Sequence, residues 1–117
     1  MTFELERRDD QRLVAHLREG AETVEVIGWN PEKAAGALLA AIDGAAQEGY
    51  SETYWFEPTG HFWWLLKRDE TRLDIAVLWS RSSAVGWQHV FQAADEFNYL
   101  ADLVRSECAR LGLGKTV

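Results

Sequence analysis

The residues able to do chemistry are few and far apart in this chain. Its histidines are His16, His61 and His89, and its one cysteine is Cys108. Metal sites bring such side chains together at short spacings such as His-x-x-x-His or Cys-x-x-Cys. None of the four residues has a second ligand-type residue at such a spacing. The sequence therefore predicts no metal site, and nothing in it calls for a cofactor.

Motifs for nucleophilic catalysis and phosphate binding are also missing. No Gly-x-Ser-x-Gly sequence is present, and Cys108 falls on the apolar face of a predicted helix, where a buried and unreactive thiol is expected. Residues 114–116 read Gly-Lys-Thr, like the end of a phosphate-binding loop, but Ala109 stands where the first glycine of that loop belongs. The sequence thus supports neither acyl transfer nor nucleotide binding.

A catalytic or small-ligand site remains the alternative function. Asp74 lies on a predicted central strand, where burial would suit a carboxylate to acid–base catalysis. Lys67 and Arg72 lie beside it, however, and favour a surface ladder of ion pairs. An enzyme or ligand-binding domain would combine His61, His89 or Asp74 with aromatic side chains in a pocket between sheet and helices.

Residues 50–80 form the centre of the predicted fold and hold eight of the fourteen aromatic residues. A three-residue loop, Pro58 to Gly60, predicts that Glu57 pairs with His61, so that Trp55 lies opposite Trp63. A second loop at residues 69–70 predicts another hairpin, in which Leu66 pairs with Leu73 and Trp64 with Ile75. Alternation along these strands assigns one face to the core. Its members are Tyr54, Phe56, Phe62, Trp64, Leu66, Leu73, Ile75, Val77 and Trp79.

The opposite face of this hairpin pair is unusually apolar. It carries Trp55, Trp63, Leu65 and Leu78 among charged residues, whereas the solvent side of an antiparallel sheet is usually polar. Two interpretations are open. Either a loop, a terminus or charged side-chain stems cover these residues, or they form a patch that binds another chain. The default partner is a second copy of the chain, which would form a homodimer through this patch.

The rest of the chain predicts three strands before the first helix, and one strand with Val85, Trp87, His89 and Phe91 between the central hairpins and the second helix. A Gly20-Ala21 turn pairs Glu19 with Glu22, and alternation places Leu5, Leu17 and Val26 on the core face of the first strands and His16 on their solvated face. Asn30 and Pro31 begin a helix that runs to about residue 48 and is capped by Gly49. A second helix covers about 95–111, and its apolar stripe includes Leu100 and Val104. The order βββ-α-ββββ-α predicts a single α+β domain over residues 1–117. Its architecture is an antiparallel sheet of about six to seven strands with two helices packed on one face.

Charge and composition restrict the class of function further. Residues 1–60 hold twelve acids and five bases, while residues 61–117 hold seven of each. This balance argues against nucleic-acid binding. The acidic rim, defined as Glu4, Glu6, Glu22 and Glu25, would steer a basic partner, although solubility alone also explains the acidity. The absence of a long apolar segment and the single cysteine predict a cytoplasmic protein without membrane contact.

In size, acidity, tryptophan content and mixed antiparallel architecture, the chain resembles the small immunity proteins that neutralise secreted bacterial toxins, and other small bacterial proteins. The resemblance covers overall character and includes no motif, so it assigns no residue a role. It implies a non-enzymatic protein-binding module, such as an inhibitor. In that interpretation Trp55, Trp63 and Leu65 anchor the partner and the acidic rim surrounds them.

Overall fold

A computed structural model describes residues 1–114, which leaves the Lys115 and Thr116 of the Gly-Lys-Thr sequence outside the described part. The strands and helices follow one another in the predicted order βββ-α-ββββ-α. In sequence they are β1 (Thr2–Arg7), β2 (Arg12–Glu19), β3 (Glu22–Trp29), α1 (Pro31–Glu48), β4 (Tyr50–Glu57), β5 (Gly60–Asp69), β6 (Arg72–Ser80), the 3₁₀ helix η1 (Ser83–Val85), β7 (Gln88–Glu96) and α2 (Phe97–Arg110).

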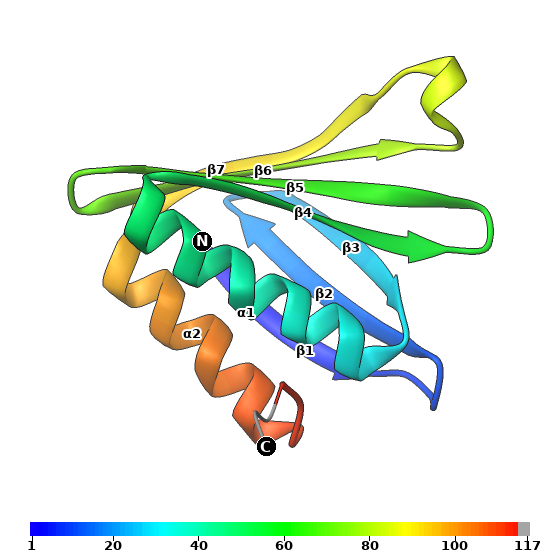
Figure 1. The fold of residues 1–117 in the computed structure, drawn as a ribbon, viewed down its shortest axis with the longest axis horizontal. Coiled ribbons are helices and arrows are strands. Elements are labelled where there is room, and N and C mark those ends of the chain that lie inside the picture. Colours follow the sequence, from blue (N-terminus) through cyan, green and yellow to red (C-terminus); the bar gives the residue numbers. More distant parts are fainter. Residues whose placement is uncertain (115–117) are drawn as a thin grey trace.

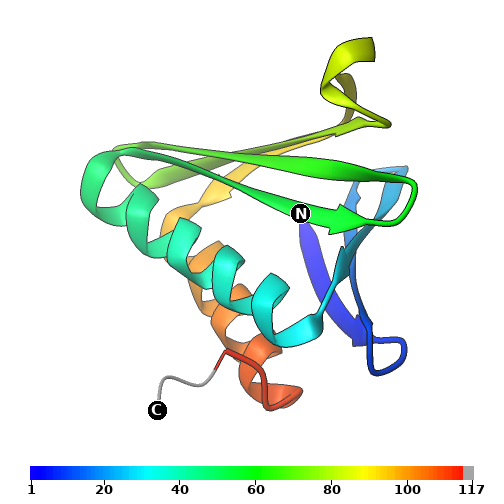
Figure 2. The same cartoon turned by 45° about the vertical axis from the view of Figure 1, so that its right-hand side comes forward.

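The strands divide into two antiparallel sheets, where the sequence suggested one continuous sheet. One sheet has the order β1-β2-β3 and the other β4-β5-β6-β7 (Figure 1). The smaller sheet stands at a steep angle to the larger one, and both helices lie in the angle between them (Figure 2). Strand β3 does not pair with β4, and each sheet packs one of its faces against the helices in a shared core. Within residues 1–114, neither helix is long and apolar enough to cross a membrane.

The first sheet has the predicted register. Glu19 pairs with Glu22, Leu17 with Val24 and Ala15 with Val26. Its inner side chains are buried together with the apolar stripes of both helices, as the sequence predicted. The shared core contains Phe3, Leu5, Leu13, Leu17 and Val26 from this sheet, Ala34, Ala35, Leu38, Ile42 and Ala45 from α1, and Phe97, Leu100, Ala101, Val104 and Cys108 from α2.

Helix α1 begins and ends at the residues that the sequence predicted. The side chain of Asn30 accepts a hydrogen bond from the backbone N–H of Lys33, and Pro31 is the first helical residue. Gly49 ends the helix in the left-handed conformation, with φ of 80°. Gly44 allows close packing, because a Cβ atom there would lie 3.1 Å from the Cβ of Ser51.

Helix α2 covers the outer edge of β1. The Glu107 carboxylate accepts a hydrogen bond of 2.9 Å from the backbone N–H of Leu5, and the Arg110 guanidinium donates to the carbonyl oxygen of the same residue. The ion pair with Arg110, followed by the Leu5 contact, lowers the pKa of Glu107. These two side chains therefore bond the backbone N–H and carbonyl oxygen of Leu5 on the edge strand, where no further strand pairs with it.

The turn between β4 and β5 differs from the predicted one by a single residue. The loop is Pro58-Thr59, and Glu57 pairs with Gly60 instead of His61. Since side chains alternate along a strand, this shift reverses the two faces of β4. Trp55 therefore points into the core and is 1% exposed, while Tyr54 and Phe56 point outward. The prediction that Trp55 belongs to the outer patch is wrong, as is the assignment of Tyr54 and Phe56 to the core.

A close contact explains why Gly60 lies in the strand. A Cβ atom at this position would lie 2.5 Å from the carbonyl oxygen of Ser80 and 2.9 Å from the ring of Trp79. The glycine is thus required for close approach to β6 in the strand, whereas the sequence placed it in the loop.

The turn between β5 and β6 lies one residue later than predicted, at Glu70-Thr71, which moves the pairing of the strands by two residues and leaves the faces unchanged. Asp69 pairs with Arg72, Leu66 with Ile75 and Trp64 with Val77. A shift of two residues changes the partner of every side chain but preserves which face it occupies. The predicted core face of β5 and β6 is accordingly correct, although the predicted pairs are not.

Trp55 joins the two sheets and α1. Its indole N–H donates a hydrogen bond of 3.0 Å to the carbonyl oxygen of Ala34 in the first turn of α1. Its ring covers Gly28 of β3, where a Cβ atom would lie 2.8 Å from the ring and 2.9 Å from the Cβ of Ala34. The ring centroid of Trp64 on β5 lies 5.0 Å away. One side chain therefore sets the spacing between these elements.

We expect Gly28→Ala to lower the free energy of unfolding by about 1–3 kcal/mol, because the added methyl group overlaps Trp55 and Ala34. Gly36→Ala is the matched control. A Cβ atom there meets no other atom within 4 Å, so the control should stabilise the protein by up to about 1 kcal/mol through its helix propensity. Urea unfolding curves measure both, and equal effects would contradict the packing around Gly28.

Replacing Trp55 and Phe56 separately tests the register of β4. Trp55→Ala should cost about 3–5 kcal/mol of unfolding free energy as a large-to-small change in the core. Phe56→Ala should cost far less, because that side chain is 62% exposed. Thermal and urea unfolding measure both variants. If the register were the one predicted from the three-residue loop, Phe56→Ala would be the more destabilising of the two changes.

Candidate functional site

Three of the four predicted patch residues lie on the outer face of the four-stranded sheet. Trp63 pairs with Leu78 and Leu65 with Ala76, which places Trp63, Leu65 and Leu78 on one side. Each of the three is half-buried. The fourth, Trp55, lies in the core, and Tyr54 and Phe56 take its place on β4 with 38% and 62% of their surface exposed.

Five rings form a continuous cluster on this outer face, which we call the aromatic face. They are Tyr54, Phe56, His61, Trp63 and Trp87. The rings of Tyr54 and Trp63 are nearly parallel, with centroids 5.8 Å apart, and Phe56 stacks on Tyr54 at 6.4 Å. The cluster therefore crosses from the edge strand β4 to β5.

Trp87 joins the aromatic face from the loop between β6 and β7. Its ring centroid lies 4.8 Å from His61 and 5.1 Å from Trp63. The indole N–H of Trp63 is buried and has no hydrogen-bond acceptor within residues 1–114. A loop thus covers Trp63, as one of the two interpretations suggested, while Tyr54 and Phe56 remain open to solvent.

The sequence assigned Trp87 to a strand and so missed its contact with the sheet surface. Gly86, with φ of 85°, directly precedes Trp87, and β7 begins only at the next residue, Gln88. This glycine was the only local signal that the strand starts later. The loop projects beyond the sheet in both views (Figures 1 and 2). Val85, 72% exposed, lines a hollow of about 320 Å³ together with Trp87.

A small pocket opens beside the aromatic face, between the end of β3, the start of α1 and the edge strand β4. Its volume is about 230 Å³. We call it the edge pocket, and its lining residues are Trp29, Lys33, Ala34, Ala37, Tyr54, Trp55 and Phe56. Lys33 is the one charged residue of this lining, and it forms no ion pair within residues 1–114.

The acidic rim lies on the other sheet, away from the aromatic face. Glu4, Glu6 and Glu25 occupy β1 and β3, and Glu22 begins β3 at the β2–β3 turn. Two of these carboxylates are engaged within the protein, because Arg8 contacts both Glu6 and Glu25 at 3.3 Å. The rim is therefore less available for a partner than the sequence suggested.

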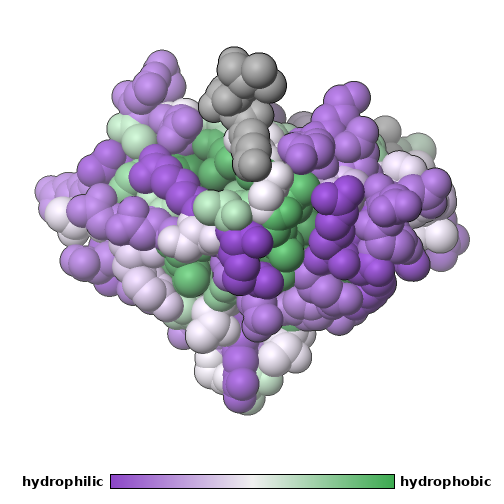
Figure 3. All heavy atoms as spheres, turned by 90° about the horizontal axis from the view of Figure 1, so that it is seen from below, coloured by the Kyte–Doolittle hydropathy of each residue, from purple (hydrophilic) through white to green (hydrophobic). Residues whose placement is uncertain are grey.

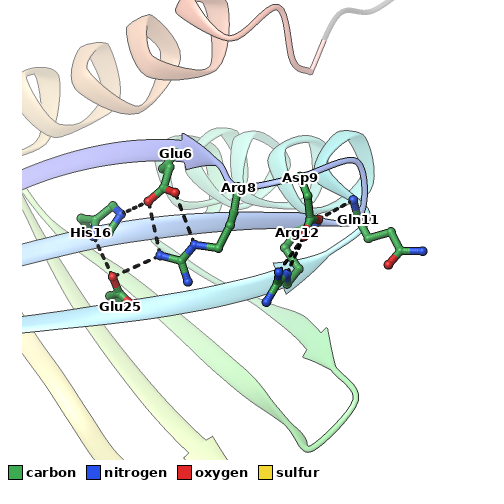
Figure 4. A network of polar contacts seen from close by, with 7 residues as sticks. All are labelled: Glu6, Arg8, Asp9, Gln11, Arg12, His16 and Glu25. Carbon is green, nitrogen blue, oxygen red and sulfur yellow. Dashed lines mark hydrogen bonds and ion pairs between the residues drawn. The ribbon is translucent and has the colours of Figure 1, made fainter.

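His16 completes this network between the same two carboxylates, as the close view shows (Figure 4). Its Nε2 lies 2.8 Å from Glu6 and its Nδ1 lies 3.4 Å from Glu25. Hydrogen bonds from Arg8, and then from His16, lower the pKa of Glu6. The sequence treated His16 as a solvated surface residue, whereas the structure gives it two acidic neighbours.

The candidate catalytic residues do not meet in a pocket between sheet and helices. His61 belongs to the aromatic face, His89 is exposed on β7, and Asp74 accepts a long hydrogen bond of 3.4 Å from Gln92. All three lie on the outer side of the sheet, and apolar side chains fill its inner side. No group of three histidine, cysteine or acidic side chains in the described residues could hold a metal ion.

Cys108 is buried in α2, as the sequence predicted, with 1% of its surface exposed. Burial, together with the negative charge of Glu107, raises the pKa of its thiol to about 11. The reactive thiolate is therefore scarce at neutral pH.

We expect Cys108 to be almost unreactive toward a thiol reagent in the folded protein at pH 8, and to react fully once urea unfolds the chain. Both the raised pKa and the burial act in this direction. Colorimetric thiol titration with and without urea measures the difference. Reaction of the folded protein at the rate of the unfolded chain would contradict this assignment.

The side of the molecule away from the four-stranded sheet has a different character. Seen from below, its surface is mostly hydrophilic, with a hydrophobic band through the middle (Figure 3). A hollow of about 410 Å³ between the helices is lined by both apolar and charged residues, among them Leu39, Asp43 and Arg105. Arg105 and Asp43 form an ion pair of 3.0 Å there, so these charges already have partners.

Comparison with family models, curated proteins and solved structures gives no significant match for this chain.

Proposed function

We propose that this protein is a non-enzymatic protein-binding module that contacts its partner through the aromatic face. The observation that carries the proposal is the exposure of Phe56, 62%, and Tyr54, 38%, at the open end of a cluster of five rings. Exposed apolar surface of this kind marks interaction sites on soluble proteins. Aromatic side chains also supply most of the binding energy in many protein interfaces.

The partner is a protein with an apolar surface, because the exposed rings of Tyr54 and Phe56 complement such a surface. Trp63, Leu65 and Leu78 extend the aromatic face across β5 and β6, and Val85 continues it onto the projecting loop. A net charge of −7 disfavours nucleic acid as the partner. The general likeness to immunity proteins suggests an inhibitor of another protein, and it extends to no particular residue.

The acidic rim contributes less to this proposal than the aromatic face. Glu6 and Glu25 are held by Arg8 and His16, which leaves Glu4 and Glu22 without an ion pair in residues 1–114. These two remaining carboxylates favour a basic partner during the diffusional encounter. The contact energy itself comes from the rings.

Affinity capture from an extract of the producing cells tests the proposal. The immobilised wild-type protein should retain a partner, and Phe56→Ser or Val85→Ser should weaken its binding about tenfold or more, as removal of a contact residue at an interface centre does. Tyr99→Ser is the matched control, since Tyr99 is an aromatic residue on α2 that is 46% exposed and lies outside the aromatic face.

Sedimentation of the purified protein separates self-association from binding of a different protein. A partner that all four baits retain equally would contradict the use of the aromatic face. A dimer that dissociates on Phe56→Ser would identify the partner as a second copy of this chain. Circular dichroism confirms that each bait is folded.

A further inference from the structure

The edge pocket is built from aromatic side chains that the rest of the protein leaves exposed. Six large hydrophobic residues are exposed in the described chain, and three of them, Trp29, Tyr54 and Phe56, line this pocket. They come from two different sheets. Half of the exposed large apolar residues in the described chain therefore lie around one small hollow.

The pocket is held in shape by the same contacts that hold the fold together. Trp55 and Ala34 line its buried side, and the hydrogen bond of 3.0 Å between them fixes the edge strand to the first turn of α1. Trp29 ends β3 directly before that helix begins. An occupant would therefore enter a pre-formed site, which reduces the entropy lost on binding.

The volume of the pocket limits what it can hold. Sites for cofactors and drug-sized ligands usually enclose about 300–1,000 Å³, whereas the edge pocket has about 230 Å³. It has room for one large side chain. Tyr54 and Phe56 belong both to this pocket and to the aromatic face, so the pocket is continuous with the surface proposed to bind a partner.

Lys33 gives the pocket a positive charge in a chain whose net charge is −7. Its side chain is exposed and has no acidic partner within residues 1–114. Glu32, its neighbour in sequence, forms no ion pair with it within these residues. The complement of this charge is a carboxylate on the occupant.

From these observations we infer that the edge pocket receives one large apolar side chain of a partner protein, with a carboxylate of that partner placed against Lys33. The inference rests on the proposed function and names the chemistry of the partner at this one point. The recognised element is an aromatic or large aliphatic residue with an aspartate or glutamate beside it. Burial of the apolar side chain supplies the affinity, and the carboxylate supplies the selectivity.

Two blocked dipeptides that differ only in charge test this chemistry on the purified protein. The probes are N-acetyl-Phe-Glu-amide and N-acetyl-Phe-Gln-amide, followed in NMR titrations through the indole N–H resonance of Trp55, which also lines the pocket. We expect affinities of about millimolar for probes of this size. The glutamate probe should bind about two- to fivefold more tightly, as a solvent-exposed ion pair allows.

Substitutions in the pocket show whether the named residues cause this preference. Lys33→Gln should make the two probes bind equally, whereas Lys67→Gln, which changes the exposed lysine of β5, should leave the preference intact. Trp29→Ala should weaken both probes. Equal binding of the two probes by the wild-type protein, or a preference that survives Lys33→Gln, would overturn the assignment of the carboxylate.

Other occupants give different results. Phenylacetate that binds as tightly as the glutamate dipeptide would indicate a site for a free aromatic acid and overturn the inference. Dissociation of a dimer on Trp29→Ala in sedimentation would assign the pocket to a second copy of the chain and also overturn it. A captured partner that is lost with Val85→Ser but retained with both Trp29→Ala and Lys33→Gln would leave the proposed function standing and reject the edge pocket.

Discussion

The contact of Trp55 with Gly28 and Ala34 is the constraint on which the arrangement of this protein depends. The indole lies where β3, β4 and α1 come closest, and it is held by a hydrogen bond to a helix carbonyl. Only glycine at position 28 allows the ring to lie so near the backbone of β3. The spacing between the two sheets is therefore set by the thickness of one aromatic ring, and the buried polar atom of that ring has its acceptor.

This inward position of Trp55 determines what the neighbouring residues can do. Because side chains alternate along β4, a tryptophan directed into the core forces Tyr54 and Phe56 outward. Trp87 then packs over Trp63 at the centre of the outer face, and the two rings at the strand edge stay open. The same packing that stabilises the fold produces the surface proposed to bind a partner.

The outer faces of the two sheets differ in chemical character. The outer face of the small sheet carries a closed network in which Arg8 and His16 each contact Glu6 and Glu25. Exposed ion pairs of this type contribute little stability, but they pair carboxylates that would otherwise be free to contact a partner. The outer face of the large sheet carries the five rings of the aromatic face at one end and charged side chains such as Lys67 and Asp74 at the other. The exposed rings of the large sheet extend into the edge pocket, where Lys33 forms no ion pair within residues 1–114.

The sequence by itself determined the features that depend on local chemistry. Asn30, Pro31 and Gly49 determined the bounds of α1 through capping and backbone preference. Period-2 alternation placed Leu5, Leu17 and Val26 in the core of the first sheet, and 3.6-residue periodicity placed Leu100 and Val104 there from α2. The order of the elements followed from these patterns. Alternation along β5 and β6 also placed Trp63, Leu65 and Leu78 correctly on one outer face.

Tertiary contacts decided the register of β4 and the separation into two sheets. A two- or three-residue turn at Pro58 satisfies local preferences equally well, and β4 is rich in apolar residues at both parities, so alternation could not choose between them. The choice depends on Gly60 approaching Ser80 and on Gly28 receiving the ring of Trp55, and both partners are distant in sequence. A shift of one residue exchanges the two faces of a strand, which is why Trp55 was misplaced among the candidate site residues while its neighbours Tyr54 and Phe56 were missed.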